Sequence, residues 1–449
     1  MDRPWAIRAV VGLTALVTML DNTVVTAAAP AIARDLDIAL PTLEWVAASY
    51  LVAFAGLLLA GGQLADGYGH RRVLGYGLVA FTAASGLAAV AGGAATLIAA
   101  RTLQGAGAAL VVPATLAIVA SRDERERVRC VAVWTACGAV GLALGPVAGG
   151  VLSQHGHWSW IFLLNLPAGA VALACCAAIS DRRRPGVPRM DWAGLGTGSP
   201  ALLAAAYALI AGTARGFTAR PVLCAAVIAA VATVAFVRVE RRTAAPLVDP
   251  RLFTARVFRG GVAVQVLWGL GVNGVYFYTA VYLQDVRGFT PSGAGLAFLP
   301  LALAVAAGAS LAPALVARFG AARTVAAGLV LVAAGMVVVA AGGAVVTLLG
   351  ALTVVGFGSA LTVPLSACIL GAVPEERAGV ASAVFGVARE VSGVLGIAGV
   401  GVVVALVGDG VGFATGYTAG LVAAAGLVLC GALLSLRTLP GPMIKASLK

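Results

Sequence analysis

The sequence predicts an all-α integral membrane protein. Its fourteen transmembrane helices are expected to form two pseudo-symmetric six-helix bundles with two extra central helices. Three observations lead to this prediction: the composition, the number of long apolar runs and an internal repeat. Of the 449 residues, 61% are hydrophobic and 11% are charged. Soluble domains carry about 25% charged residues, and a single soluble core stops growing near roughly 250–300 residues. A chain this long and this apolar is therefore expected to lie in a membrane.

The predicted spans come from the apolar runs, because about 20 such residues cross a bilayer as a helix. Runs of this kind lie at 6–29, 43–65, 73–91, 96–120, 130–152, 158–179, 192–212, 221–237, 260–283, 292–316, 324–341, 345–371, 378–407 and 414–436. The first run follows a basic start like that of a signal peptide. Since Asp21 interrupts a long apolar run there, we expect an uncleaved first span.

The orientation follows from Lys and Arg, which favour cytoplasmic loops. With the N-terminus placed inside, four of the 30 basic residues lie in outside loops and two lie deep within spans; these six are Arg34, Arg215, Arg220, Arg287, Arg101 and Arg389. Both termini are thus expected in the cytoplasm, which requires an even number of spans. The net charge of +12 is then a topology signal, and we expect no nucleic-acid partner. An excess of Arg over Lys suggests a GC-rich bacterial genome, so the expected location is the bacterial cytoplasmic membrane.

An internal repeat explains the layout. When the chain is shifted by 251 residues, "RTLQGAGAALVVPATLAIV" at 101–119 falls on "LTVVGFGSALTVPLSACIL" at 352–370, with eight identical residues that include Gly105, Gly107 and Pro113. The offset predicts a duplicated six-helix unit with about 70 residues to spare. We therefore expect a six-helix bundle at 1–180, two additional helices with cytoplasmic linkers at 181–257, and a second six-helix bundle at 258–449. Two related bundles with a site at their interface are a common transporter plan.

Two stretches carry motif-like patterns. The loop "GGQLADGYGHRRVLGYG" at 61–77 combines Asp66, Gly69, Arg71 and Arg72, which suits a charge latch between helix ends or a plain positive-inside loop. In "GAVGLALGPVAGGVL" at 138–152, glycines recur every four residues on one helix face, which favours close helix packing, and a proline kinks the span. The residues concerned are Gly141, Gly145, Pro146, Gly149 and Gly150.

These stretches resemble signatures of the major facilitator superfamily. The loop is similar to the family's loop signature, although Gly67 and His70 stand where basic residues are usual. The glycine-rich helix looks like the antiporter signature of the drug-exporting branches, and "WSWIFLLNLPAG" at 158–169 follows it as in the fourteen-span drug/proton antiporters. "LDNTVVTAAAPAIARDL" at 20–36 resembles the first-span motif of that subfamily. The resemblance covers essentially the whole chain and implies the major facilitator fold.

Charged residues inside the spans are candidates for proton coupling or substrate binding, because such groups are costly and usually functional. Arg101 lies roughly 7 Å from the outer end of its span and Asp21 about 12 Å, at 1.5 Å per residue. "RTLQG" at 101–105 matches the family motif associated with proton coupling. Alternatively, Arg101 reaches the outer interface, or Asp21 caps a helix or pairs statically with Arg101. Glu390 is a candidate for a second proton site or for an anchor of cationic substrates; alternatively, Arg389 or another partner neutralises it.

Other polar residues inside the spans are weaker candidates. Asn22, Gln104, Asn165 and Asn273 can line a cavity or bridge helices. Glu44 is expected to be solvated near the outer surface. His155 and His157 lie without a third ligand candidate, so we expect no metal site.

The energy source is expected to be an ion gradient, because the sequence has no P-loop and its two lysines, Lys445 and Lys449, lie at the C-terminal tail. We predict a proton-coupled antiporter that exports a small amphipathic drug, antibiotic or natural product by alternating access. Protons, this substrate and membrane lipids are the expected partners of a monomer, with no ATP and no cofactor. The alternatives are an uptake carrier or facilitator of the same superfamily, or a lipid-handling flippase. An enzyme is least favoured.

Overall fold

The computed structural model describes residues 4–179, 191–243, 246–248, 250–373 and 378–440. Within this part of the chain, fourteen helical segments are long and apolar enough to cross a membrane, which confirms the predicted number of spans. The described residues include no β-strand. The basic cluster at 182–184 and the lysines at 445 and 449 lie outside the described residues.

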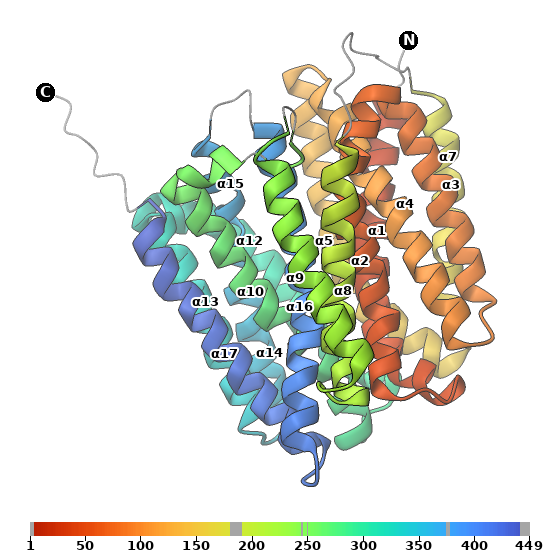
Figure 1. The fold of residues 1–449 in the computed structure, drawn as a ribbon, viewed down its shortest axis with the longest axis vertical. Helices are drawn as coiled ribbons and strands as arrows, with labels where there is room; N and C mark the ends of the chain where they lie inside the picture. The colour runs from red at the N-terminus through yellow and green to blue at the C-terminus, as the bar shows by residue number, and fades with distance from the viewer. Residues whose placement is uncertain (1–3, 180–190, 244–245, 249, 374–377, 441–449) are drawn as a thin grey trace, which may run out of the picture. The chain divides into compact units, whose positions relative to one another are not determined.

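The helices follow one another along the chain, and most of the α-helices are labelled in Figure 1. They are α1 (Pro4–Asp35), α2 (Leu40–Tyr68), α3 (His70–Ala89), α4 (Ala94–Ala120), α5 (Glu124–His155), α6 (Trp160–Leu163), α7 (Asn165–Ala177), α8 (Trp192–Arg215), α9 (Arg220–Glu240), the 3-10 helix η1 (Pro250–Thr254), α10 (Arg256–Val281), the π-helix η2 (Tyr282–Val286), α11 (Pro291–Ala297), α12 (Leu299–Phe319), α13 (Ala321–Ala340), α14 (Val345–Ala360), α15 (Pro364–Gly371), α16 (Ala378–Gly408) and α17 (Phe413–Thr438).

Several predicted spans are interrupted helices. The sixth span consists of α6 and α7, the tenth of α11 and α12, and the twelfth of α14 and α15. Pro364 begins α15 and Pro300 lies in the first turn of α12, where a residue without a backbone N–H is tolerated. The ninth span continues from α10 into η2, and π-helical turns of this kind are frequent at functional sites.

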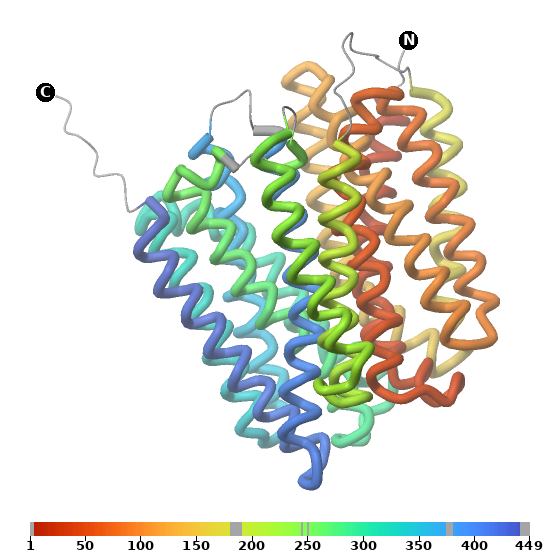
Figure 2. The backbone as a smooth tube through the Cα atoms, in the orientation of Figure 1, coloured from red at the N-terminus to blue at the C-terminus, as the bar shows by residue number. Residues whose placement is uncertain are grey.

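The chain packs as two compact units. The first comprises Met1–Leu247 and Ala280–Leu296, and the second comprises Val248–Thr279 and Ala297–Lys449. Figure 2 shows the path of the backbone through these segments, coloured by residue number. The segment 280–296, which includes η2 and all of α11 except Ala297, therefore packs with helices that precede it in the sequence by more than a hundred residues. The division into 1–180, 181–257 and 258–449 stays a prediction.

Close helix pairs build the first unit. α1 runs along α5, α2 and α3 both pack on α4, and α8 pairs with α9 and rests against α2. Gly61 of α2 faces the backbone carbonyl of Ala109, and a side chain at Gly61 would overlap that oxygen. The hydroxyl of Ser199 in α8 donates to the carbonyl of Gly56 at 2.8 Å. Small residues allow such approaches, which matter where lipid is as apolar as the protein interior.

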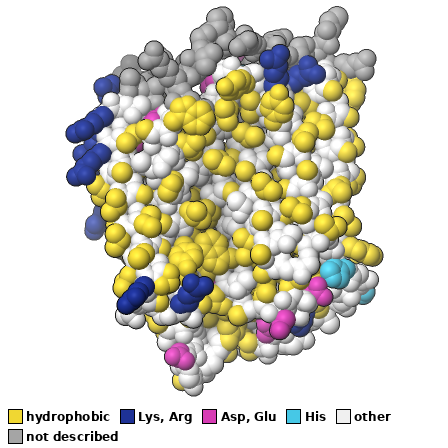
Figure 3. Space-filling model, turned by 45° about the vertical axis from the view of Figure 1, so that its right-hand side comes forward, with side chains coloured by type: hydrophobic (Ala, Val, Ile, Leu, Met, Phe, Trp, Pro, Cys, Tyr) yellow, Lys and Arg dark blue, Asp and Glu magenta, His cyan; other side chains and the backbone are white. Residues whose placement is uncertain are grey.

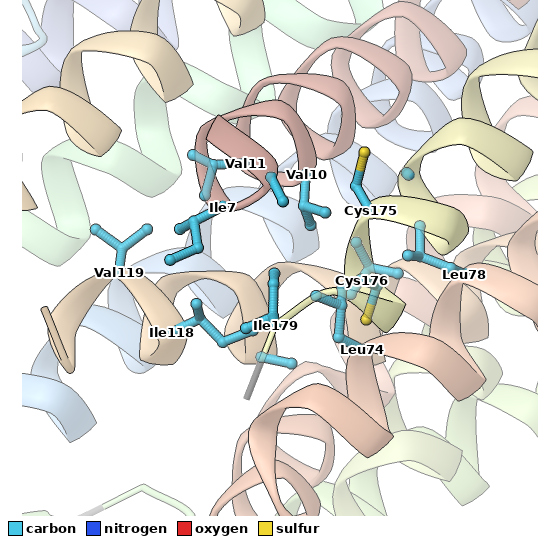
Figure 4. Packing of buried hydrophobic residues seen from close by; sticks show 14 of the residues in the cluster. Ile7, Val10, Val11, Leu74, Leu78, Ile118, Val119, Cys175, Cys176 and Ile179 are labelled. Atoms are coloured by element: carbon cyan, nitrogen blue, oxygen red, sulfur yellow. The ribbon is translucent and has the colours of Figure 1, made fainter. Parts of the chain in front are cut away.

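A hydrophobic cluster joins α1, α3, α4 and α7 near the N-terminal end of α1. Figure 4 labels its members Ile7, Val10, Val11, Leu74, Leu78, Ile118, Val119, Cys175, Cys176 and Ile179. The two adjacent cysteines are buried and take part as small apolar side chains, as expected of cysteine inside a span. This cluster fixes one end of the helices that carry the polar site described below.

The second unit repeats packing contacts of the first. In the first unit, Gly105 of α4 faces the carbonyl of Tyr50 and Gly107 faces the backbone of Phe81. In the second unit, Gly356 of α14 faces the carbonyl of Leu301 and Gly358 faces the backbone of Val332. Each residue named in the second unit lies 251 positions after its counterpart in the first. The repeated glycines therefore make the same close approaches in both halves of the sequence.

The surface has the polarity of a membrane protein. On the face shown in Figure 3, hydrophobic side chains cover a broad band, and charged side chains lie toward the two ends of the helices. Exposed apolar side chains are abundant on α9, where they include Leu223, Val227, Ile228, Val231 and Val234. In water such an exposed apolar stripe would favour aggregation, whereas in a membrane it can face the lipid tails.

Candidate functional site

A cluster of polar side chains lies inside the first unit. Asp21 comes from α1, Ser85 from α3, Arg101 and Gln104 from α4, and Asn165 from α7. Each side chain belongs to a residue that is at most 1% exposed. The cluster thus gathers residues up to 144 positions apart in the sequence at one water-excluded point.

Asp21 is the centre of this cluster. Its Oδ2 lies 2.5 Å from Nη1 of Arg101, and its Oδ1 accepts from the amide groups of Gln104 at 3.1 Å and Asn165 at 2.8 Å. All three partners are donors, so the arrangement suits an ionised carboxylate. A buried charge needs such partners, because an ion taken out of water without compensation is strongly destabilising.

The guanidinium of Arg101 is enclosed as completely as the carboxylate. Its Nη1 also donates to Oε1 of Gln104 at 3.0 Å, and its Nε donates to the carbonyl of Val46 at 3.4 Å. The ring of Tyr50 lies 4.6 Å from the Arg101 Cζ, and that of Phe162 lies 5.8 Å away. Arg101 is 1% exposed, so in this structure its side chain stays inside the protein and does not extend to the outer interface.

The second charged candidate lies in the second unit. Glu390 of α16 is buried, and its Oε1 accepts from Nη2 of Arg389 at 2.7 Å and from Nε at 2.9 Å. The side chain of Arg389 is 44% exposed. This ion pair therefore differs from that of Asp21 and Arg101, because one of its partners is partly exposed whereas both Asp21 and Arg101 are buried.

The remaining polar candidates do not join the Asp21 cluster through any hydrogen bond recorded among the described residues. Asn22 is partly exposed on the neighbouring face of α1. Asn273 donates to the carbonyl of Gly269 within α10 at 3.0 Å.

The glycine-rich stretch on α5 contacts two partners. Gly141, Gly145 and Gly149 lie against α1, where added side chains would meet Leu16, Thr23 and Val24. On another side of α5, Gly150 faces the carbonyl of Pro291, and the carbonyl of Pro146 faces Gly295. One helix face thus holds α1 and another holds α11, and no larger residue fits at either contact.

The predicted latch loop places its residues at the turn between α2 and α3. Gly69 adopts φ 100, a conformation that favours glycine, and so allows the two helices to join directly. Oδ1 of Asp66 lies 3.2 Å from Nε2 of His70. Nε of Arg71 donates to the carbonyl of Cys176, at the end of α7, at 3.2 Å. The acid is therefore paired with the histidine, and Arg71 ties the loop to α7. Arg72 lies in the first turn of α3.

A model of the major facilitator superfamily matches residues 11–397. The chain belongs to the major facilitator superfamily. It is 35% identical to the puromycin resistance protein of Streptomyces alboniger, over 88% of this chain and 81% of that protein. It is 34% identical to the methylenomycin A resistance protein of Streptomyces coelicolor, over 88% and 85%. The chain is thus a transporter of this superfamily and a multi-pass membrane protein, and its named relatives are antibiotic-resistance proteins.

Solved transporter structures share the fold of this major facilitator protein. A peptide transporter POT in complex with sulfate superposes with a TM-score of 0.71 at 14% identity, covering 97% of this chain and 93% of that one. The human organic anion transporter MFSD10 superposes with a TM-score of 0.65 at 17% identity, covering 97% and 100%. Likeness at these identities concerns the fold alone.

Sequence reasoning missed several residues that surround the site of this major facilitator transporter. Ser85 accepts from Gln104 at 2.8 Å, and Tyr50 and Phe162 face Arg101. Phe162 precedes Asn165 by three residues, so helical spacing could have placed it on the same side. No signal of that kind singles out Tyr50 or Ser85.

One sequence expectation was wrong. Glu44 was expected to be solvated, but it is 2% exposed. It falls on the same face of α2 as Ala48 and Leu51, which are also buried, and that face turns into the protein. Glu44 is in contact with other groups and lies two residues before Val46, whose carbonyl accepts from Arg101.

Proposed function

We propose that this major facilitator transporter is a proton-coupled antiporter that exports a small amphipathic drug, antibiotic or natural product by alternating access. The observation that carries the proposal is the buried ion pair of Asp21 and Arg101. A carboxylate held by three donors in a water-excluded place is a group whose contacts must change when it takes up a proton. The export of an antibiotic is inferred from the named relatives.

The proposed coupling step begins with the site as it is observed, with Asp21 ionised and Arg101 paired to it. A proton on Asp21 removes the charge that Arg101 faces and converts one carboxylate oxygen into a donor. A proton on Oδ2 would displace Nη1 of Arg101, and a proton on Oδ1 would displace at least one of the amide groups of Gln104 and Asn165, which donate to that oxygen. Because these side chains belong to α1, α4 and α7, protonation alters contacts among three helices and can thus bias the arrangement of the bundle.

The substrate is proposed to compete with the proton. A compound that favours the ionised form of Asp21 lowers the affinity of the site for protons, and by linkage protons lower the affinity for the compound. Proton uptake from outside would therefore accompany substrate release, and proton loss to the cytoplasm would restore the site. Glu390 is proposed as a second proton or substrate site, whose charge Arg389 balances in the observed arrangement.

The remaining features fit the same proposal. The α5 contacts of Gly141, Gly145 and Gly149 with α1 would transmit movement of α1 to its neighbours. The loop of Asp66, Gly69, Arg71 and Arg72 is proposed to act as a cytoplasmic latch. We further propose a monomer in the bacterial cytoplasmic membrane with both termini inside, built from six helices, two central helices and six helices.

Proton release on substrate addition tests the proposal. The purified protein in weakly buffered detergent solution is titrated with puromycin and methylenomycin A, and binding heat and pH change are recorded together. At least one compound that binds should release protons, and Asp21→Asn should abolish the release. Glu44→Gln is the matched control, since it removes another buried carboxyl group of the same unit.

The roles of the two candidate acids separate in this experiment. Loss of proton release in Glu390→Gln but not in Asp21→Asn would move the coupling site to α16. Binding without proton release from any version would contradict competition at a shared acid, and would favour the facilitator or lipid-handling alternatives.

A further inference from the structure

Two hydrogen-bond donors in the middle of α10 have no partner among the residues that the structure describes. They are Nε2 of Gln265 and Nε1 of Trp268. Gln265 is 5% exposed, and the indole nitrogen of Trp268 is enclosed as well. Residues three positions apart are neighbours on the surface of a helix, so the two side chains lie beside each other on α10.

The depth of these donors in the span makes the lack of a protein partner costly. The span that contains α10 runs from Arg256 to Val286, and Trp268 lies about 18 Å from its first residue at 1.5 Å per residue. Tryptophan is common at membrane interfaces, where its N–H group meets water, but this position lies well inside the span. A buried donor without a partner is unfavourable and calls for a specific explanation.

The internal repeat shows that the fold does not require donors at these two positions. With the offset of 251 residues, Gln265 corresponds to Thr14 of α1 and Trp268 corresponds to Val17. The hydroxyl group of Thr14 donates to the carbonyl of Val10 in its own helix at 2.8 Å. The first half of the chain therefore has a satisfied hydroxyl group and an apolar side chain where α10 has two unpaired donors.

The charges close to the donors compensate each other. A side chain at Gly269, the residue after Trp268, would overlap the hydroxyl group of Ser392, so α16 touches α10 at the level of the donors. Glu390 precedes Ser392 by two residues, and its carboxylate is paired with Arg389 at 2.7 Å. Since this pair has no net charge, the donors suit a neutral acceptor better than an anion.

We propose that Gln265 and Trp268 bind the transported compound by donating hydrogen bonds to its neutral acceptor oxygens, such as carbonyl or ether groups. The inference rests on the proposed function and names the chemistry of its substrate. Asp21 corresponds to Val272 at the offset of 251 residues, so the carboxyl group of α1 is absent from α10. The two halves thus divide the work: the first carries the proton site, and the second recognises the acceptor groups of the compound.

The indole N–H of Trp268 provides a direct test. The full-length protein is prepared with ¹⁵N-labelled tryptophan, and the signal of Trp268 is the one that Trp268→Phe removes from the seven indole signals. Puromycin and methylenomycin A, which carry acceptor oxygens, are the probes, and at least one of them should move this signal downfield. Trp268→Phe and Gln265→Met should each weaken binding of that compound by about 2- to 10-fold, as expected for one lost hydrogen bond.

Matched controls separate hydrogen bonding from packing. Tetraphenylphosphonium has no hydrogen-bond acceptor, so it should leave the Trp268 signal in place, and Trp268→Phe and Gln265→Met should not change its affinity. Thr14→Val alters the position in α1 that corresponds to Gln265, and Trp134→Phe alters a tryptophan that packs against the hydrophobic cluster of the first unit. Both control variants should bind the acceptor-bearing compound like the unsubstituted protein.

The inference and the proposed antiport fail in different ways. If neither acceptor-bearing compound moves the Trp268 signal, or if both variants keep full affinity, the donors do not bind the compound and the inference is wrong. Proton release that is lost in Asp21→Asn would still support the antiport in that case. If the signal moves and the affinities fall as expected but no proton is released, the donor site stands and the antiport fails.

Discussion

Trp158 donates its indole N–H to Oδ2 of Asp35 at 2.6 Å and thereby joins the loop before α6 to the C-terminal end of α1. His157 lies 3.3 Å from the same oxygen. η2 also contacts α1, where Gln284 donates to the carbonyl of Ala27 at 3.0 Å. The end of α1 beyond Asp21 is therefore fastened at two points within the first unit.

We expect Trp158→Phe to lower the free energy of unfolding by about 1 kcal/mol. A hydrogen bond to a charged group is worth about 1.5–3 kcal/mol when buried, and the Asp35 side chain is about half exposed, which reduces that value. Thermal unfolding followed through the reactivity of the buried Cys130, Cys175 and Cys176 measures the change. Trp160→Phe is the control, because Trp160 is exposed. Equal melting temperatures for both variants would contradict the fastening role.

We expect Gly105→Ala and Gly356→Ala to destabilise the protein to a similar degree. In each case the new methyl group would overlap a backbone carbonyl, of Tyr50 or of Leu301, and overpacking of this kind costs about 1–3 kcal/mol. Gly86→Ala on α3 should be harmless, since no described atom lies within 4 Å of the added carbon. A marked loss at Gly105 with none at Gly356 would show that the two halves do not share the contact.

The contact of α5 with α1 should be disturbed by a methyl group at Gly149 but not by one at Gly138. Gly149→Ala places a methyl group against the carbonyl of Val24, whereas the nearest atoms to a methyl group at Gly138 are side-chain carbons at 3.7 and 4.0 Å. We expect Gly149→Ala to reduce efflux of a transported compound from cells and to lower stability by about 1–3 kcal/mol. Gly138→Ala should retain both. Efflux that survives in Gly149→Ala would mean that the separation of α1 and α5 does not limit transport.

How much of this could be predicted from the sequence depends on what kind of signal each feature leaves. The spans could be predicted because membrane thickness fixes the length of an apolar run. The repeat could be predicted because Gly105 and Gly356 must remain small wherever helices touch through their backbones. Asp21 and Arg101 were found because charge is rare inside a span.

The partners of these residues could not be derived in the same way. A transmembrane helix is apolar on nearly all sides, so no amphipathic pattern marks the face that turns inward. Glu44 was expected to be solvated because it lies near the outer end of its span, and no pattern showed that its face turns inward. Tyr50 likewise gave no sign that its ring would face Arg101. The π-helical turn that presents Gln284 to α1 likewise depends on contacts between segments more than 250 residues apart.

The ion pair on α16 should respond asymmetrically to loss of its partners. Glu390→Gln leaves Arg389, whose side chain is 44% exposed, able to find other polar partners. Arg389→Gln leaves a carboxylate that is 5% exposed without its observed counter-charge, which is more costly. We expect a loss of about 0–1 kcal/mol for the first variant and several kcal/mol for the second, measured by thermal unfolding. The opposite order would mean that Glu390 stabilises the fold through another partner.

The pair of Asp21 and Arg101 should show strong coupling in a double-mutant cycle. Arg101→Met leaves a buried carboxylate without a cation, and breaking a buried pair in this way costs about 3–5 kcal/mol. Asp21→Asn retains the shape of the side chain but leaves Arg101 unbalanced, so it should also destabilise. The combined variant removes both charges, so its loss of stability should be smaller than the sum of the single losses by about 1–3 kcal/mol.

Thermal unfolding of the four proteins gives the coupling energy, and efflux of a compound that the unsubstituted protein exports gives the functional counterpart. Recovery of stability without recovery of efflux would show that the charges serve transport rather than folding. Additive losses would contradict a direct interaction, and recovered efflux in the uncharged protein would remove Asp21 from the coupling step.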